Sequence, residues 1–119
     1  FVSQFGYPIT TGLLECSEES ISKFRNDYLK KLESLTSRNL ITTDKMPQNF
    51  LYVGLITASF PEAKILHVKR NPAAVCWANY KQWFKSKELG YSYSIDDIIE
   101  YHRLYEDLME FWNNVKPYE

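Results

Sequence analysis

The sequence predicts an α/β fold with one parallel βαβ unit and additional helices. Two short runs rich in apolar and β-branched residues, Leu40–Thr43 and Ile65–Val68, have the composition of strands. Between them, the segment Pro47–Ser59 is apolar on nearly all sides, which indicates a helix buried against a sheet. A strand, a helix and a strand with short connections form a unit with a right-handed crossover, so the two strands are parallel.

The first helix is predicted to follow Ser17, whose hydroxyl can cap the free N–H groups of a helix start. Glu18 and Glu19 occupy the first turn, where negative charge is favourable. Apolar side chains then recur at helical spacing, at Ile21, Phe24, Tyr28, Leu32 and Leu35. We therefore expect this helix to pack through one face.

The second predicted strand, Ile65–Val68, is a nearly continuous apolar run, as in strands that are covered on both faces. Arg70 follows it, and then Asn71 provides an N-cap side chain. Pro72 takes the first helical position, where a missing N–H costs little. These signals predict a helix from Pro72 through Phe84.

The last helix is predicted from Ser94 to about Val115. Ser94 and Asp97 form a variant of the capping box, in which the serine hydroxyl bonds a backbone N–H three residues later. One face of this helix is marked by Ile95, Ile98, His102, Tyr105, Met109 and Trp112. A loop at Gly90–Tyr93 precedes it.

Two basic side chains follow the predicted strands. Lys45 comes after the first strand and Arg70 after the second. Parallel strands end at one edge of a sheet, where helix N-termini attract anions, so we expect both cations to face a crevice that binds a phosphate. An arginine after a strand also often serves only as a surface ion-pair partner, and Asp44 can balance the charge of Lys45 at a turn. From the residues alone, both readings remain open.

Composition narrows the functional classes. The 119 residues carry a net charge of −1 and are 45% hydrophobic, which is typical of a globular chain and gives no reason to expect a nucleic-acid or membrane partner. No apolar run is long enough to span a membrane. Cys16 and Cys76 are expected to be reduced thiols, with a single disulfide as the alternative. His67 and His102 are expected to be hydrogen-bonded structural residues, and their spacing predicts no metal site.

Several segments together resemble a known family. They are Thr43-Asp44-Lys45-Met46-Pro47-Gln48-Asn49-Phe50, Phe60-Pro61, Ala63-Lys64-Ile65 and Arg70-Asn71-Pro72-Ala73-Ala74-Val75-Cys76-Trp77. These motifs resemble the middle of a bacterial sulfotransferase domain, of the type joined to tetratricopeptide repeats and related to tyrosylprotein sulfotransferases. The similarity extends from about Cys16 to Tyr118. It implies a partial P-loop-type three-layer fold.

The resemblance implies that the chain binds the sulfuryl donor PAPS (3′-phosphoadenosine 5′-phosphosulfate) or its product PAP (3′-phosphoadenosine 5′-phosphate), without a metal. In that family the arginine after the second strand binds the 3′-phosphate. The lysine after the first strand contacts the 5′-phosphate and the transferring sulfuryl group. By position these are Arg70 and Lys45, and Lys45 is the expected catalytic residue. Ala78 replaces a serine of the family that also binds the 3′-phosphate, and Asn79 is expected to substitute for it.

The family also has a glycine-rich phosphate loop of the Arg-Ser-Gly-Thr kind and a general base before these motifs, and neither Gly6 nor Gly12 lies in such a loop. We therefore interpret residues 1–119 as a single partial sulfotransferase domain. Residues 1–16 form an irregular lead-in, and residues 17–119 form a helix, the βαβ core and the C-terminal helices. Such a chain is part of an enzyme that transfers a sulfuryl group from PAPS to a hydroxyl or amine acceptor, and is inactive alone.

Other interpretations remain open. The main alternative is a degenerate, non-catalytic module that binds a nucleotide or a protein, which Ala78 and the missing phosphate loop favour. A small helical interaction domain with accidental similarity requires that the two apolar runs do not form parallel strands. Two strands alone make a weak sheet, so a homo-oligomer is a further expectation, because a second copy could complete it. The acceptor is not identified, and the resemblance implies a cytoplasmic location by default.

Overall fold

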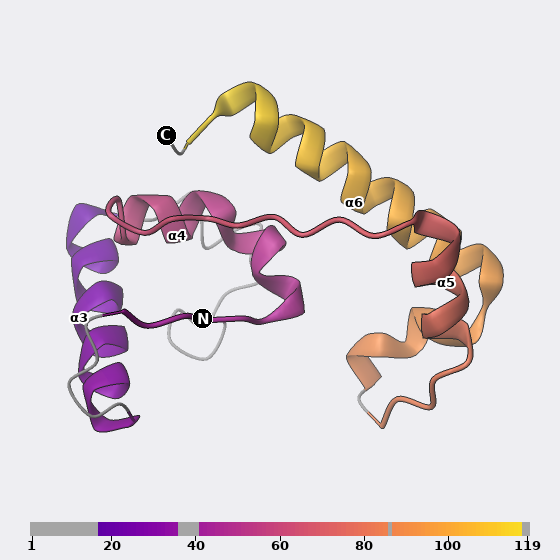
Figure 1. The fold of residues 1–119 in the computed structure, drawn as a ribbon. Coiled ribbons are helices and arrows are strands. Elements are labelled where there is room, and N and C mark those ends of the chain that lie inside the picture. Colours follow the sequence, from indigo (N-terminus) through magenta and orange to yellow (C-terminus); the bar gives the residue numbers. More distant parts are fainter. Residues whose placement is uncertain (1–16, 36–40, 86, 118–119) are drawn as a thin grey trace. The chain divides into compact units, whose positions relative to one another are not determined.

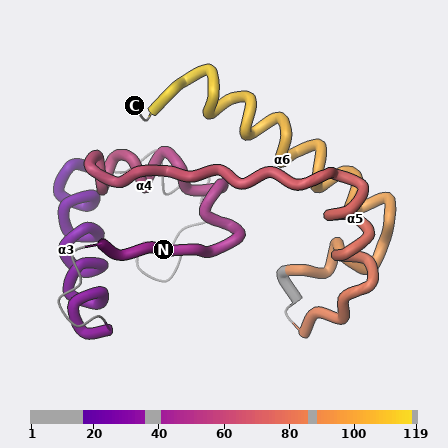
Figure 2. Tube along the Cα trace, in the orientation of Figure 1, coloured from indigo at the N-terminus to yellow at the C-terminus, as the bar shows by residue number. Residues whose placement is uncertain are grey.

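The computed structural model describes residues 17–35, 41–85 and 87–117 (Figures 1 and 2). The chain divides into two compact units, Phe1–Ala63 and Lys64–Glu119. The described elements of the first unit are α3 (Glu18–Leu35), the 3₁₀ helix η1 (Pro47–Tyr52) and α4 (Val53–Ser59). Those of the second unit are α5 (Pro72–Tyr80), the 3₁₀ helix η2 (Lys87–Tyr93) and α6 (Ile95–Val115).

The described residues contain no β-strand, so the predicted α/β fold with its parallel βαβ unit is wrong. The two runs expected to be strands lie instead in segments without regular structure, and Leu40 is outside the described residues. Figure 1 draws the segment 64–71 as an extended trace that leads into α5. A strand is stable when its N–H and C=O groups pair with a neighbour, and neither run has such a neighbour in the described part of the chain.

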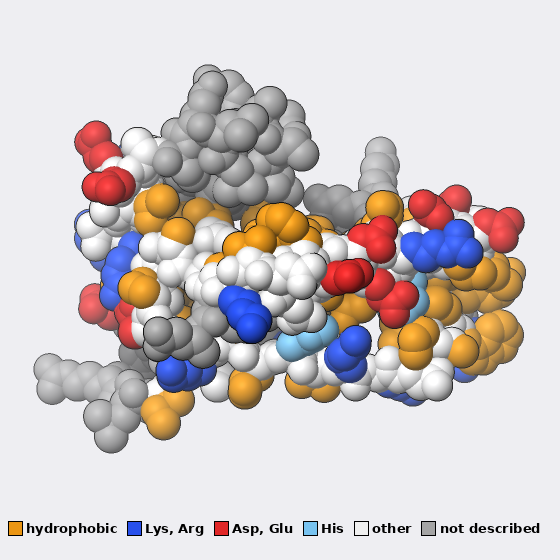
Figure 3. Space-filling view, turned by 90° about the horizontal axis from the view of Figure 1, so that it is seen from above, with side chains coloured by type: hydrophobic (Ala, Val, Ile, Leu, Met, Phe, Trp, Pro, Cys, Tyr) orange, Lys and Arg blue, Asp and Glu red, His pale blue; other side chains and the backbone are white. Residues whose placement is uncertain are grey.

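The apolar side chains of these segments are correspondingly open to solvent. Leu66 and Val68 are each 88% exposed, and Ile41 is 83% exposed. Figure 3 shows apolar side chains lying at the surface among charged ones. A three-layer fold would cover such residues on both faces of a central sheet. The expected layering is therefore also wrong for the described residues.

In the first unit, α3 packs against α4 and the turn that follows α4 (Figure 1). Val53 and Leu55 of α4 are buried. Phe24 and Tyr28 of α3 lie against Phe60, with ring centroids 6.3 and 5.1 Å apart. The predicted apolar face of the first helix is thus confirmed at these two aromatic positions.

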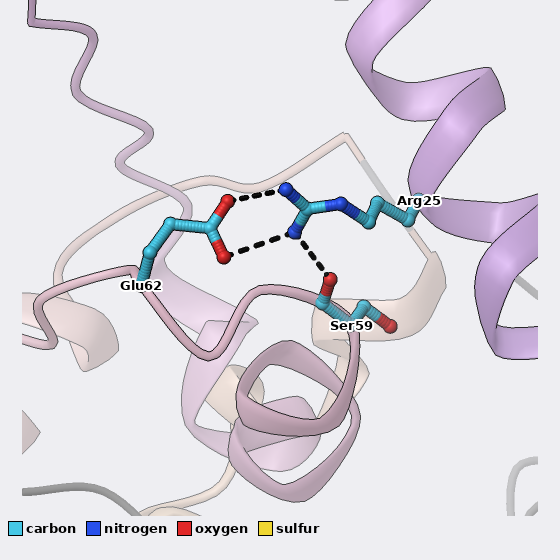
Figure 4. Close-up of polar contacts among 3 residues, drawn as sticks. All are labelled: Arg25, Ser59 and Glu62. Carbon is cyan, nitrogen blue, oxygen red and sulfur yellow. Dashed lines mark hydrogen bonds and ion pairs between the residues drawn. The ribbon is translucent and has the colours of Figure 1, made fainter.

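Arg25 joins the same two parts through polar contacts (Figure 4). Its Nη1 donates to the carbonyl oxygen of Ser59 at 2.7 Å and to Oε2 of Glu62 at 3.0 Å. Its Nη2 donates to Oε1 of Glu62 at 2.5 Å. The guanidinium also lies over the ring of Phe60, 5.2 Å from the centroid. One side chain of α3 therefore anchors both the end of α4 and the turn beyond it.

Three predicted helix starts are confirmed, because each is capped by the expected side chain. The N–H groups of Ser20, Ala74 and Asp97 donate to Ser17 Oγ (3.2 Å), Asn71 Oδ1 (3.1 Å) and Ser94 Oγ (3.3 Å), respectively. The segment Pro47–Ser59 is helical as predicted, but it begins as η1 and becomes α-helical only at Val53. Met46, before η1, makes no side-chain cap bond.

In the second unit, α6 packs against α5 and η2, and Ile98 and Met109 of α6 are buried. The expected loop at Gly90–Tyr93 belongs to η2. The predicted end of the α5 helix at Phe84 was too late, since α5 ends at Tyr80. No described helix combines the length and the apolar character that crossing a membrane requires.

Candidate functional site

Arg70 lies in the second unit, at the end of the extended segment 64–71 and directly before Asn71, the N-cap of α5. It is exposed, and it makes no hydrogen bond or ion pair with any described residue. The simple reading of Arg70 as a surface ion-pair partner therefore has no support in the described part of the chain. An unpaired guanidinium next to a helix N-terminus can bind a phosphate through its fixed set of N–H donors.

Lys45 lies in the first unit, in the segment 41–46 that precedes η1. It is exposed and has no hydrogen-bond or ion-pair partner among the described residues. The neighbouring Asp44 does not pair with it, because Asp44 Oδ2 accepts a hydrogen bond from Tyr28 Oη of α3 at 2.7 Å. The α-helix expected to begin beside Lys45 is a six-residue 3₁₀ helix, so the predicted support from an α-helix dipole is absent there.

The Tyr28–Asp44 contact has an electrostatic consequence. It is the main reason that the pKa of Tyr28 rises from its usual 10.0 to about 12, with burial and the charge of Asp44 adding to the effect. Tyr28 is therefore protonated at neutral pH and donates to the carboxylate. The hydrogen bond connects α3 to the residue directly before Lys45.

Asn79, the third predicted site residue, is half-buried near the C-terminal end of α5. Its backbone carbonyl accepts a hydrogen bond from the N–H of Gln82 at 3.1 Å. Arg70 precedes the opposite end of the same helix, so the two backbones lie roughly 13 Å apart along the axis at 1.5 Å rise per residue, a gap that only the side chains can narrow. The structure places Arg70 and Asn79 in one unit but not side by side.

His67 belongs to the same extended segment as Arg70, and it is hydrogen-bonded as predicted. Its Nε2 lies 2.6 Å from Tyr105 Oη of α6, and the two rings meet nearly edge to face. His102 stacks on the Tyr105 ring, with the two ring centroids 5.4 Å apart and an interplanar angle of 13°. Sequence reasoning missed the His67–Tyr105 contact, because no local signal connects residues 38 positions apart.

Exposed cations beside extended segments and capped helices are features of proteins that bind anionic ligands. The sequence pattern described as "Sulfotransferase family" matches residues 7–119, and the chain belongs to the sulfotransferase family. The resemblance found in the sequence is thus confirmed at the level of the family. The match over nearly the whole chain also excludes accidental similarity.

One relative is an uncharacterised protein of Aquifex aeolicus (strain VF5). It is 35% identical to this chain over 107 residues, which make up 88% of the chain. The same residues make up 14% of the relative, so the chain spans only a small part of that protein. No solved structure matches the chain.

Proposed function

We propose that the chain is part of a sulfotransferase and binds the donor PAPS, with Arg70 as a ligand of its 3′-phosphate. The observation that carries the proposal is the state of Arg70 itself. It is exposed, it lacks a charged partner among the described residues, and it directly precedes a capped helix in the segment Arg70-Asn71-Pro72 that resembles the family motif. A guanidinium binds phosphate through two parallel N–H donors, which fixes the orientation of the nucleotide.

Lys45 is the proposed catalytic residue. In-line transfer of SO₃ from PAPS to a hydroxyl or amine acceptor forms a bond between the acceptor and sulfur while the bond from sulfur to the leaving phosphate oxygen breaks. Negative charge develops on the sulfuryl and leaving oxygens, and a lysine ammonium there stabilises the transition state. The acceptor proton requires a base, and we assign none among the described residues. The chain alone is therefore expected to bind the donor without turning it over.

Isothermal titration with PAP tests the donor site. Arg70→Ala is expected to weaken binding at least about tenfold, the effect of losing a hydrogen bond to a charged group. The matched control is Arg103→Ala, which removes the same charge from an exposed position on α6 where Arg103 pairs only at 3.6 Å with Glu100. This control is expected to bind PAP as the unchanged chain does.

A second ligand makes the assignment specific. Adenosine 5′-phosphate lacks the 3′-phosphate, so Arg70→Ala and the unchanged chain should bind this nucleotide equally well. Equal losses for both nucleotides would contradict the assignment of Arg70 to the 3′-phosphate. Lys45→Ala should weaken both nucleotides, because both carry the 5′-phosphate, and Lys30→Ala on the exposed side of α3 serves as its control.

A non-catalytic nucleotide-binding module is the second candidate. Ala78, which stands where the family has a phosphate-binding serine, is the observation that favours it. A protein that combines this domain with a glycine-rich phosphate loop of the family distinguishes the two candidates. Transfer of labelled sulfate from PAPS to any acceptor would support the enzyme, whereas PAP binding without transfer would support the module.

A further inference from the structure

Both proposed ligands of the donor project from segments that have no regular structure. Lys45 lies in the segment 41–46 and Arg70 in the segment 64–71. Backbone in such segments is not held by a ladder of hydrogen bonds, and ordering it costs conformational entropy. If the segment is unrestrained, this entropy is lost when its cation binds a phosphate, and the affinity is lower. The contacts that restrain these two segments therefore matter for ligand binding.

The first segment is restrained by Tyr28. Its hydroxyl donates to Asp44 at 2.7 Å, and Asp44 is the residue next to Lys45. The ring of Tyr28 is itself held, because it lies 5.1 Å from the ring of Phe60 and 6.5 Å from that of Phe24. The packed face of α3 thus fixes a hydrogen-bond donor against the segment that carries Lys45.

The second segment is restrained by Tyr105 in a comparable way. Tyr105 Oη lies 2.6 Å from His67 Nε2, and the Tyr105 ring stacks on His102 one turn earlier in α6. Arg70 is exposed, and Leu66 and Val68 of the same segment are each 88% exposed. The contact to α6 therefore holds the segment at His67 while Arg70 stays open to solvent.

The structure assigns Tyr28 and Tyr105 as positioning residues, each of which holds one extended segment so that its cation is presented to the donor. This assignment rests on the proposed function of Lys45 and Arg70. Neither tyrosine is a catalytic residue, because each acts through the cation that its segment carries. The hydrogen bond from Tyr28 ends one residue from Lys45, and the hydrogen bond between Tyr105 and His67 lies three residues from Arg70.

Tyr28→Phe and Tyr105→Phe remove the two hydroxyls and keep both packed rings. Each variant is expected to weaken PAP binding about fivefold, the effect of one lost hydrogen bond. Tyr80→Phe is the matched control, because Tyr80 is 44% exposed and its stack on Trp77 does not need the hydroxyl. Asp44→Asn and His67→Gln keep a hydrogen-bond partner and should retain most of the affinity.

Double variants separate positioning from general stability. Tyr28→Phe should have no further effect on PAP binding when Lys45 is already alanine, and Tyr105→Phe none when Arg70 is already alanine. Losses that persist in these backgrounds would overturn the assignment. If the unchanged chain does not bind PAP at all, the proposed donor site fails.

A measurement without ligand tests the positioning in either case. Backbone ¹⁵N relaxation should show that Tyr28→Phe increases fast motion at residues 43–45 and leaves residues 67–70 unchanged, and that Tyr105→Phe does the reverse. Unchanged order at both segments in both variants would overturn the inference. Failure of the donor site and failure of the positioning role are thus distinguishable.

Discussion

Arg25 and Glu62 form a two-pronged ion pair, in which Nη2 lies 2.5 Å from Oε1 and Nη1 lies 3.0 Å from Oε2. The same Nη1 also donates to the Ser59 carbonyl oxygen at 2.7 Å. The planar guanidinium makes these contacts from two separate nitrogens that match the carboxylate, whereas a lysine ammonium is a compact charge on a single nitrogen. This pair connects residues that are 37 positions apart in the sequence.

Arg25→Lys is therefore expected to lower the melting temperature by a few degrees, although it keeps the positive charge. Arg103→Lys is the control, because Arg103 is exposed and pairs only at 3.6 Å with Glu100. Thermal unfolding followed by circular dichroism measures both variants. Equal melting temperatures for Arg25→Lys and the unchanged chain would show that the two-pronged geometry of the ion pair contributes nothing to stability.

The effect of Arg25→Lys should also depend on acid pH. The hydrogen bond from Arg25 is the main cause that holds the pKa of Glu62 below its usual 4.5. A carboxyl whose pKa is lowered by folding contributes stability above its unfolded pKa and loses it as the pH falls through the folded value. The difference between the two proteins should therefore be present at pH 7 and shrink below about pH 4.5.

The stability that Tyr28 contributes is expected to be lost as the pH rises, in contrast to that of the Arg25–Glu62 pair. Its pKa is raised from 10.0 to about 12 in the folded protein, so folding favours the protonated form. The corresponding stability is complete below pH 10.0 and is lost as the pH rises toward about 12. Burial also raises the pKa values of Tyr91, Tyr101 and Tyr105, so the comparison must be with Tyr28→Phe. In urea titrations, the advantage of the unchanged chain over this variant should shrink above pH 10, and a constant difference would contradict the prediction.

Ala78→Ser is expected to increase the affinity for PAP, if Arg70 binds the 3′-phosphate. The new hydroxyl would add one hydrogen bond to the phosphate, an effect of about fivefold. Asn79→Ala tests the same region from the other side, since loss of affinity would support Asn79 as the substitute ligand. Titration with PAP and with adenosine 5′-phosphate measures both variants, and an equal gain for both nucleotides would contradict the assignment.

The helix starts were predictable because a cap is a local event. Ser17, Asn71 and Ser94 each bond a backbone N–H three residues later, so the residue type and its neighbours carry the signal. Arg70 and Lys45 also lie within motifs that can be read along the chain, and their role as ligands stays a prediction. Family membership followed from the same motifs, and the match over residues 7–119 confirms it.

The strands could not be predicted correctly, because a strand depends on a partner that its own sequence does not provide. Leu66 and Val68 have the composition of a buried strand, yet they are exposed in a segment that pairs with no strand in the described part of the chain. The end of α5 at Tyr80 was likewise missed, because helix ends are set by weak, competing hydrogen bonds.

The sequence by itself therefore determined where α3, α5 and α6 begin, which cations precede η1 and α5, and to which family the chain belongs. Only the tertiary structure decided that Tyr28 bonds Asp44 and that Tyr105 bonds His67, across 16 and 38 positions of the chain. Caps and motifs depend on residues a few positions apart, whose geometry is set by the local backbone. Contacts between distant residues exist only once the packing of helices has brought their side chains within reach.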